Sequence, residues 1–205
     1  MMTDKFNDKQ GVLLQGHIKI HNPETGEIMV DKRNAIHYEN MSISLAESLS
    51  NQGQGMVYQM AFGNGGTNVD PTGIITYLSP NSTGTNASLY NQTYAKVIDN
   101  NNVNNVDPTR NKLETRHVSG TNYTDIVATC LLDYGEPSGQ DALDNATAND
   151  SLYVFDELGL VSYASSGTGR LLTHVIFHPV QKSLNRLIQI DYTVRVQSLT
   201  GFNEV

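Results

Sequence analysis

The sequence predicts a mainly β fold: an antiparallel β-sandwich with one short helix and long ordered loops. Gly, Pro, Asn, Ser and Thr interrupt the 205-residue chain about every ten residues, as turns do between short strands. Between these interruptions, apolar and polar residues alternate in several segments, which is typical of strands with one buried face. The length suits a single β-rich domain over residues 1–205.

The first expected element is a β-hairpin over residues 11–33. Ile18 and Ile20 alternate with polar residues, which indicates a strand with one apolar face. Gly26 supplies a residue that adopts positive φ without strain, so a turn is expected there. Ile28–Val30 then begins the returning strand.

One helix is expected at Met41–Asn51, with Asn40 as its N-cap and Gly53 as its stop. Ser44 and Glu47 are expected to face solvent. At 100° per residue, the apolar face holds four residues: Met41, Leu45, Ala46 and Leu49. A helix of this kind is expected to cover one end or face of a sheet.

A strand at Met56–Phe62 is followed by a loop-rich excursion over residues 63–122. Three apolar islands in the excursion are expected to be short strands or anchors: Ile74–Leu78, Leu89–Tyr90 and Tyr94–Ile98. A polar excursion of this length is unusual in a compact domain. An ordered one needs a neighbour to lie against, which favours an assembly.

The last third has the most regular pattern. Its expected strands are Tyr123–Asp133, Leu152–Phe155, Leu158–Tyr163, Leu171–Phe177 and Leu187–Val196. In the first of these, Ala128, Cys130 and Leu132 share a face. In the last, Ile188, Ile190, Tyr192 and Val194 do the same.

Composition excludes several classes of function. The net charge of −8 is unsuited to nucleic acid, because phosphate contacts need a basic face. A single cysteine, Cys130, excludes an intrachain disulfide. The N-terminal residues lack the apolar core of a signal peptide, and no apolar run reaches the ~18 residues of a membrane helix. We therefore expect neither nucleic acid nor membrane as a partner.

The chemistry-bearing residues do not form a recognisable active site. The pairs His17/His21 and His174/His178 lie in expected strands, where four residues span about 13 Å, so one metal ion cannot bridge them. We expect these histidines on a polar sheet face, and Cys130 buried and inert within its strand. No catalytic residue, cofactor or metal ligand is predicted, and the chain is not expected to be an enzyme.

Two alternatives stay open. The Asp- and Asn-rich stretches around Asp70, Asp99 and Asp107 suit Asx-turns or calcium ligands. Together with the ten tyrosines they would also suit a carbohydrate- or receptor-binding module. A hydrolase would need paired carboxylates, but Asp156 and Glu157 are neighbours in a strand and are expected to face opposite ways.

Three segments in order carry a resemblance: Asn34–Ile36 with the following helix; Met60–Gly66 with Leu89–Asn91 and Tyr94; and Phe155–Leu160 with Gly169–His174, Phe177, Lys182 and the closing strand to Val196. This layout resembles the N-terminal modules of tailed-bacteriophage tail-collar and fibre-attachment proteins, and other small phage structural proteins. The resemblance implies a virion protein, made in the host cytoplasm, that binds other virion proteins and self-associates as a homo-oligomer. A neck, tail or baseplate accessory subunit is the first expectation, and a capsid decoration protein the alternative.

Five charged residues are expected as assembly contacts: Asp156, Glu157, Lys182, Arg186 and Arg195. The three basic side chains would pair with such carboxylates across subunits. Exposed pairs contribute only about 0–1 kcal/mol each, so they would set register more than affinity. The alternative is that Phe155 and Leu158 pack in the core while the acidic pair between them caps a turn.

Overall fold

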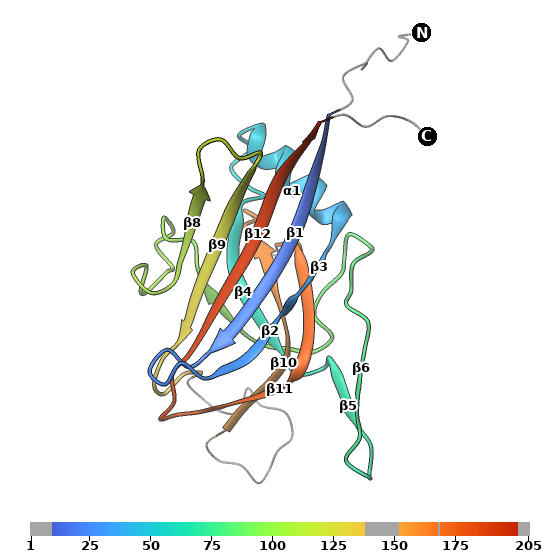
Figure 1. Cartoon of the computed structure of the whole chain (residues 1–205), viewed down its shortest axis with the longest axis vertical. Coiled ribbons are helices and arrows are strands. Elements are labelled where there is room, and N and C mark those ends of the chain that lie inside the picture. The colour runs from blue at the N-terminus through green and yellow to red at the C-terminus, as the bar shows by residue number, and fades with distance from the viewer. Residues whose placement is uncertain (1–9, 138–151, 168, 201–205) are drawn as a thin grey trace.

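The computed structural model describes residues 10–137, 152–167 and 169–200. Two five-stranded antiparallel sheets pack against each other, with a helix at one end and a two-stranded hairpin that projects from the body (Figure 1). The expected mainly β, antiparallel sandwich with one short helix is confirmed.

The first sheet has the order β2-β1-β12-β9-β8. Its strands are β1 (Gln10–His21), β2 (Ile28–Arg33), β8 (Lys112–His117), β9 (Tyr123–Leu132) and β12 (Ile188–Thr200). The second sheet has the order β3-β11-β10-β4-β7. Its strands are β3 (Ala35–Ile36), β4 (Val57–Gly63), β7 (Gln92–Val97), β10 (Leu152–Ser162) and β11 (Thr173–Ser183). The projecting hairpin is β5 (Thr67–Val69) and β6 (Ile75–Tyr77).

The chain changes sheets at Asn34, and this crossing shapes one edge of the sandwich. β1 pairs with β12 along its whole length, but β2 pairs only with His17–His21 of β1. After Arg33 the chain leaves this edge, and β3 pairs instead with Thr173 and His174 of β11. The N-terminal half of β1 is therefore left without a strand on its outer edge among the described residues.

The core lies between the sheets, as the alternating pattern predicts. Ala128, Cys130 and Leu132 of β9 lie beside Ile190 and Tyr192 of the neighbouring strand β12, and all five belong to one buried cluster. The second sheet contributes an aromatic group of Phe62, Tyr153, Phe155 and Phe177, whose neighbouring rings have centroids 5.4–5.7 Å apart. Such aromatic pairs add about 0.5–1.5 kcal/mol each beyond the burial of their area.

Residues 152–162 form one strand, not two strands around a turn as expected. The pairing of β10 with β11 shifts in register between Phe155 and Glu157. Because of this irregularity Phe155 and Leu158 both reach the core. The acidic pair lies within the strand, so the prediction that it caps a turn is wrong.

The helix α1 spans Tyr38–Leu49 and begins three residues earlier than expected. Its N-cap is His37, whose ring Nδ1 accepts a hydrogen bond from the backbone N–H of Asn40 at 3.1 Å. Asn40 is instead buried, and its side chain donates to the Leu171 carbonyl. The helix therefore packs against the segment before β11. In the described part of the chain, no helix is long and apolar enough to span a membrane.

The buried face of α1 also differs from the prediction. Ser44 is buried, whereas Ala46 and Leu49 are exposed. The hydrogen bonds of His37 and Asn40 at its N-terminus fix the rotation of the helix. A buried face chosen from apolar spacing alone is therefore wrong here. Met41 does lie in the core, as expected.

Much of the excursion is regular. Besides β5, β6 and β7, it contains β8, which the sequence did not indicate and which extends the first sheet beyond β9. Leu89 lies with Ala61, Val161 and Leu171 in a small buried cluster apart from the main core. The excursion therefore covers part of the second sheet, and the buried Leu89 is one of the residues that hold it there.

A substitution at Gly159 of β10 tests how closely β10 packs against the start of β11. A Cβ at this position would lie 2.2 Å from the Thr173 carbonyl oxygen, a backbone atom. Gly159→Ala is therefore expected to lower the free energy of unfolding by about 2–3 kcal/mol in urea titrations. Ser48→Ala, on the exposed side of α1, is the control, and an equal effect of both changes would contradict this packing.

Candidate functional site

The hairpin of β5 and β6, residues 67–78, extends away from both sheets (Figure 1) and is called the arm below. Val69 pairs with Ile75 and Thr67 with Tyr77, so these four side chains share one face of the arm. Val69 is 61% exposed, and Ile74, at the start of the returning strand, is 60% exposed. The arm thus presents apolar side chains to solvent at its end.

The tip of the arm is closed by Asp70. One carboxylate oxygen of Asp70 accepts hydrogen bonds from the backbone N–H and hydroxyl of Thr72 and from the N–H of Ile74. These donors, the Thr72 hydroxyl first, hold the pKa of Asp70 below its ordinary value. Gly73 adopts φ +86°, a conformation that favours glycine. The Asp–Pro sequence therefore forms an Asx-type turn, one of the two alternatives that the sequence left open.

Asp156 holds the first strand of the arm at its base. Its carboxylate accepts hydrogen bonds from the N–H of Gly66 at 2.9 Å, from the N–H of Thr67 at 2.8 Å, and from the Thr67 hydroxyl. Burial raises the pKa of Asp156 above its ordinary value, and these donors offset that effect only in part.

Glu157 joins both ends of the segment that contains the arm. Its carboxylate accepts from the N–H groups of Gly65 (3.1 Å), Tyr90 (3.0 Å) and Asn91 (2.8 Å). Its fourth donor is the ring Nε2 of His174, at 2.9 Å. Burial alone would raise the pKa of Glu157, but the donors, His174 first, outweigh it and hold the pKa below its ordinary value.

His174 is oriented from both sides. The N–H of Asn81 donates to its Nδ1 at 2.8 Å, so Nδ1 carries no proton and Nε2 is the nitrogen that donates to Glu157. Both side chains of this pair are completely buried. The ring therefore connects the loop around residue 81 to the same carboxylate that holds residues 65, 90 and 91.

Asp156, Glu157 and His174 are called the anchor below. Both carboxylates turn towards the excursion, because the register irregularity of β10 breaks the strict alternation of its side chains. The prediction that the two carboxylates face opposite ways is therefore wrong. A buried carboxylate is tolerated only when donors replace its water, and here backbone amides of the excursion supply them. The anchor fixes the base of the arm to the sandwich.

The structure gives the other residues expected as assembly contacts partners within the chain. Lys182 is buried and donates to the Ser183 carbonyl at 2.8 Å. Arg186, between β11 and β12, pairs at 2.8 Å with Glu27 in the turn of the N-terminal hairpin. Arg195 forms a two-pronged pair with Asp125 at 2.7 and 2.8 Å. Among the five, Arg186 and Arg195 remain the partly exposed ones, and inter-subunit contacts through them stay a prediction.

The histidine expectation is right for part of the set. His17 lies 2.8 Å from an Asp31 oxygen, His21 lies 3.0 Å from Asp191, and the exposed His178 contacts the Tyr77 hydroxyl. The expectation is wrong for His174, which is buried under the excursion. Within the described residues, no three His, Cys, Asp or Glu side chains gather as a metal site would require.

Cys130 is buried in β9, as expected. Burial raises the pKa of its thiol to about 12, so the thiol keeps its proton.

The sequence contains one overlooked signal for the anchor. Val175 and Phe177 of β11 belong to the core, and Ile176 between them is also buried. Consecutive apolar residues of this kind indicate a strand covered on both faces. That pattern places His174, on the same side as Ile176, under a cover instead of on a solvated face.

No protein-family model, curated protein or solved structure matches this chain. The candidate site is therefore defined by its geometry: an arm with exposed apolar side chains, fixed by a buried anchor.

Replacing Glu157 tests the anchor. Glu157→Gln places an amide NH₂ among donors that need an acceptor, and is expected to lower the free energy of unfolding by about 3–5 kcal/mol at neutral pH. The folded pKa lies below the ordinary 4.5, so the stabilisation is present above that pH and is lost as the pH falls through the folded pKa. The difference from wild type should shrink in that acid range.

Glu114→Gln is the matched control for this change. Glu114 lies on β8 and pairs with Lys112 and Arg116 at the surface. Its replacement should change stability little, because water replaces the lost partner. Equal effects of the two substitutions in urea titrations would contradict the anchor.

Lys182 gives a second dependence of stability on pH. Burial lowers the pKa of its amine from 10.5 to about 8, whereas an ion pair would raise that pKa and give the opposite slope. Between these values the unfolded chain holds the proton that the folded chain has lost, so stability should rise with pH there. Lys182→Met removes this contribution, and the wild-type curve should gain on the variant curve from pH 8 to 10.5. Parallel curves would contradict the burial of a charged amine.

Proposed function

We propose that this chain is a non-enzymatic structural subunit of a tailed-bacteriophage virion. It acts by self-association and docking, as a neck, tail or baseplate accessory subunit. The resemblance of residues 34–197 to phage collar and fibre-attachment modules supports the class of protein. The observation that supports docking is the arm, because it offers apolar side chains on a base held by buried hydrogen bonds.

The anchor matters for docking because it reduces the entropy cost of binding. An isolated two-stranded hairpin is marginally stable in water, so a free arm would have to be ordered when it binds. Here Asp156 and Glu157 already fix the residues at its base. A preorganised projection with exposed Val69, Ile74 and Tyr77 suits burial against a neighbouring subunit.

The copy number of this chain in purified virions tests the proposal. Quantitative mass spectrometry against the major capsid protein is expected to give a small fraction of the capsid copy number, as for a neck, tail or baseplate subunit. A ratio near that of the capsid protein would support capsid decoration instead. Absence from the particle would contradict a structural role.

A polar hollow on the outer face of the first sheet favours a second candidate, a carbohydrate- or receptor-binding module. The hollow measures about 640 Å³ and is lined in part by Thr129, Gln189, Asp191 and Thr193. Asp191 accepts a hydrogen bond from the Gln189 amide at 2.9 Å and lies 3.0 Å from His21. Such planar polar side chains suit sugar hydroxyls. Binding of wild type, but not of Asp191→Asn, to a glycan array would support this function. No binding of wild type would exclude it.

A further inference from the structure

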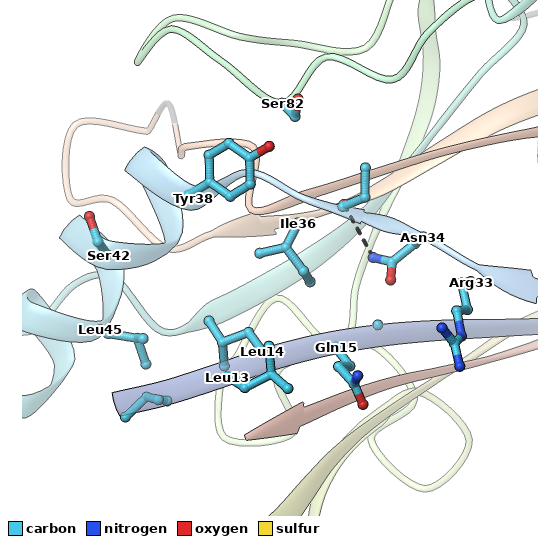
Figure 2. Close-up of a pocket in the computed structure, with 13 residues that line it drawn as sticks. Leu13, Leu14, Gln15, Arg33, Asn34, Ile36, Tyr38, Ser42, Leu45 and Ser82 are labelled. Carbon is cyan, nitrogen blue, oxygen red and sulfur yellow. Dashed lines mark hydrogen bonds between the residues drawn. The ribbon is translucent and has the colours of Figure 1, made fainter. Parts of the chain in front are cut away.

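A groove opens where the two sheets separate beside α1 (Figure 2). It measures about 640 Å³. Its apolar lining comes from three elements: Val12, Leu13 and Leu14 of β1, Ile36 of β3, and Tyr38 and Leu45 of α1. Tyr38 is 69% exposed at its rim. The groove exists because the chain leaves the edge of β1 at Asn34.

The floor of the groove is an open strand edge. The Gly16 carbonyl accepts the N–H of Asn34, so the backbone groups of Gly16 point to this outer edge. Backbone groups of alternate residues in a strand point the same way, which directs those of Leu14 and Val12 to the same edge. Among the described residues no strand pairs with this edge before His17. Unpaired groups of this kind bind another extended strand.

The arm has the complementary features. β6 is an extended segment of three residues, paired on one side with β5 and with no strand on its other side in the described part of the chain. Its residues Ile75 and Tyr77 share a face with Val69. If β6 of a second copy paired with β1, that apolar face could lie over Ile36, Tyr38 and Leu45.

Charge fixes the direction of pairing. Arg33 is the one charged residue that lines the groove, and none of the described carboxylates forms an ion pair with it. Asp70 is the one charged residue of the arm, and only one of its two carboxylate oxygens is used in the turn. Antiparallel pairing of β6 with β1 brings the tip that precedes β6 next to Gly16, which is beside Arg33. The opposite charges then meet.

We propose that the arm of one copy of this chain adds as a strand to the β1 edge of a second copy and fills the groove. This inference rests on the proposed self-association and names its two surfaces. The arm and the groove are different surfaces, so the contact is heterologous and joins copies head to tail, into a ring if the rotation closes.

Sedimentation velocity of the purified chain over a range of concentrations tests this contact. Wild type is expected to form oligomers. Val69→Asp, at the exposed end of the arm, should weaken association by about ten-fold or more. Val103→Asp is the matched control, because Val103 is 96% exposed in the excursion outside the arm, and it should associate as wild type does.

Two further changes test the strand edge and the charge pair. Val12→Pro removes an N–H that points to the groove without removing a bond to β12, so it should weaken association while the fold is retained. R33D should weaken association, because it places a carboxylate opposite Asp70, and R33K, which keeps the positive charge, should associate as wild type does. Wild-type association of Val69→Asp and Val12→Pro, or a monomeric wild type, would overturn the inference. If the two variants associate as wild type does and the chain is present in virions, the proposed function stands without this contact. A monomeric wild type in virions would leave only the docking to other virion proteins.

Discussion

The buried carboxylate of Glu157 is the interaction on which the shape of the excursion depends. Four donors from segments far apart in the chain meet at its two oxygens: Gly65, Tyr90, Asn91 and the ring of His174. A charge in this position would be costly without them, and these amides would be unpaired without the charge. Each side therefore stabilises the other. The arm projects from a base that these hydrogen bonds to Glu157 hold in place.

The same topology produces both surfaces that we assign to docking. The chain crosses between sheets at Asn34, which leaves the first half of β1 open and the groove beside it. The excursion leaves β4 at Gly63 and returns as β7, with the arm between them. One surface offers unpaired backbone groups and the other an amphipathic strand. A sandwich with both features is suited to association with its own copies, provided that the two surfaces meet between molecules.

Most strands of the two sheets could be predicted from the sequence, because their signals are local; β8 and the continuity of β10 could not. The alternation of Ala128 and Cys130 in β9, and of Ile190 and Tyr192 in β12, reports the buried face directly. The anchor could not be predicted in this way. His174 is covered by Asn81 and Tyr90, which lie 93 and 84 positions earlier in the chain, and no local pattern encodes those contacts. The prediction of Asn40 as the N-cap is wrong for a related reason. The Asn40 side chain binds the Leu171 carbonyl in the segment before β11, and His37 caps the helix instead.

Hydrogen–deuterium exchange at the three backbone amides bound by Glu157 tests the central claim most directly. These amides belong to Gly65, Tyr90 and Asn91, all in loops outside the strands. The anchor predicts that they exchange slowly, at rates close to those of core strands, while amides at the arm tip exchange fast. Fast exchange at all three, as in solvated loops, would contradict the account.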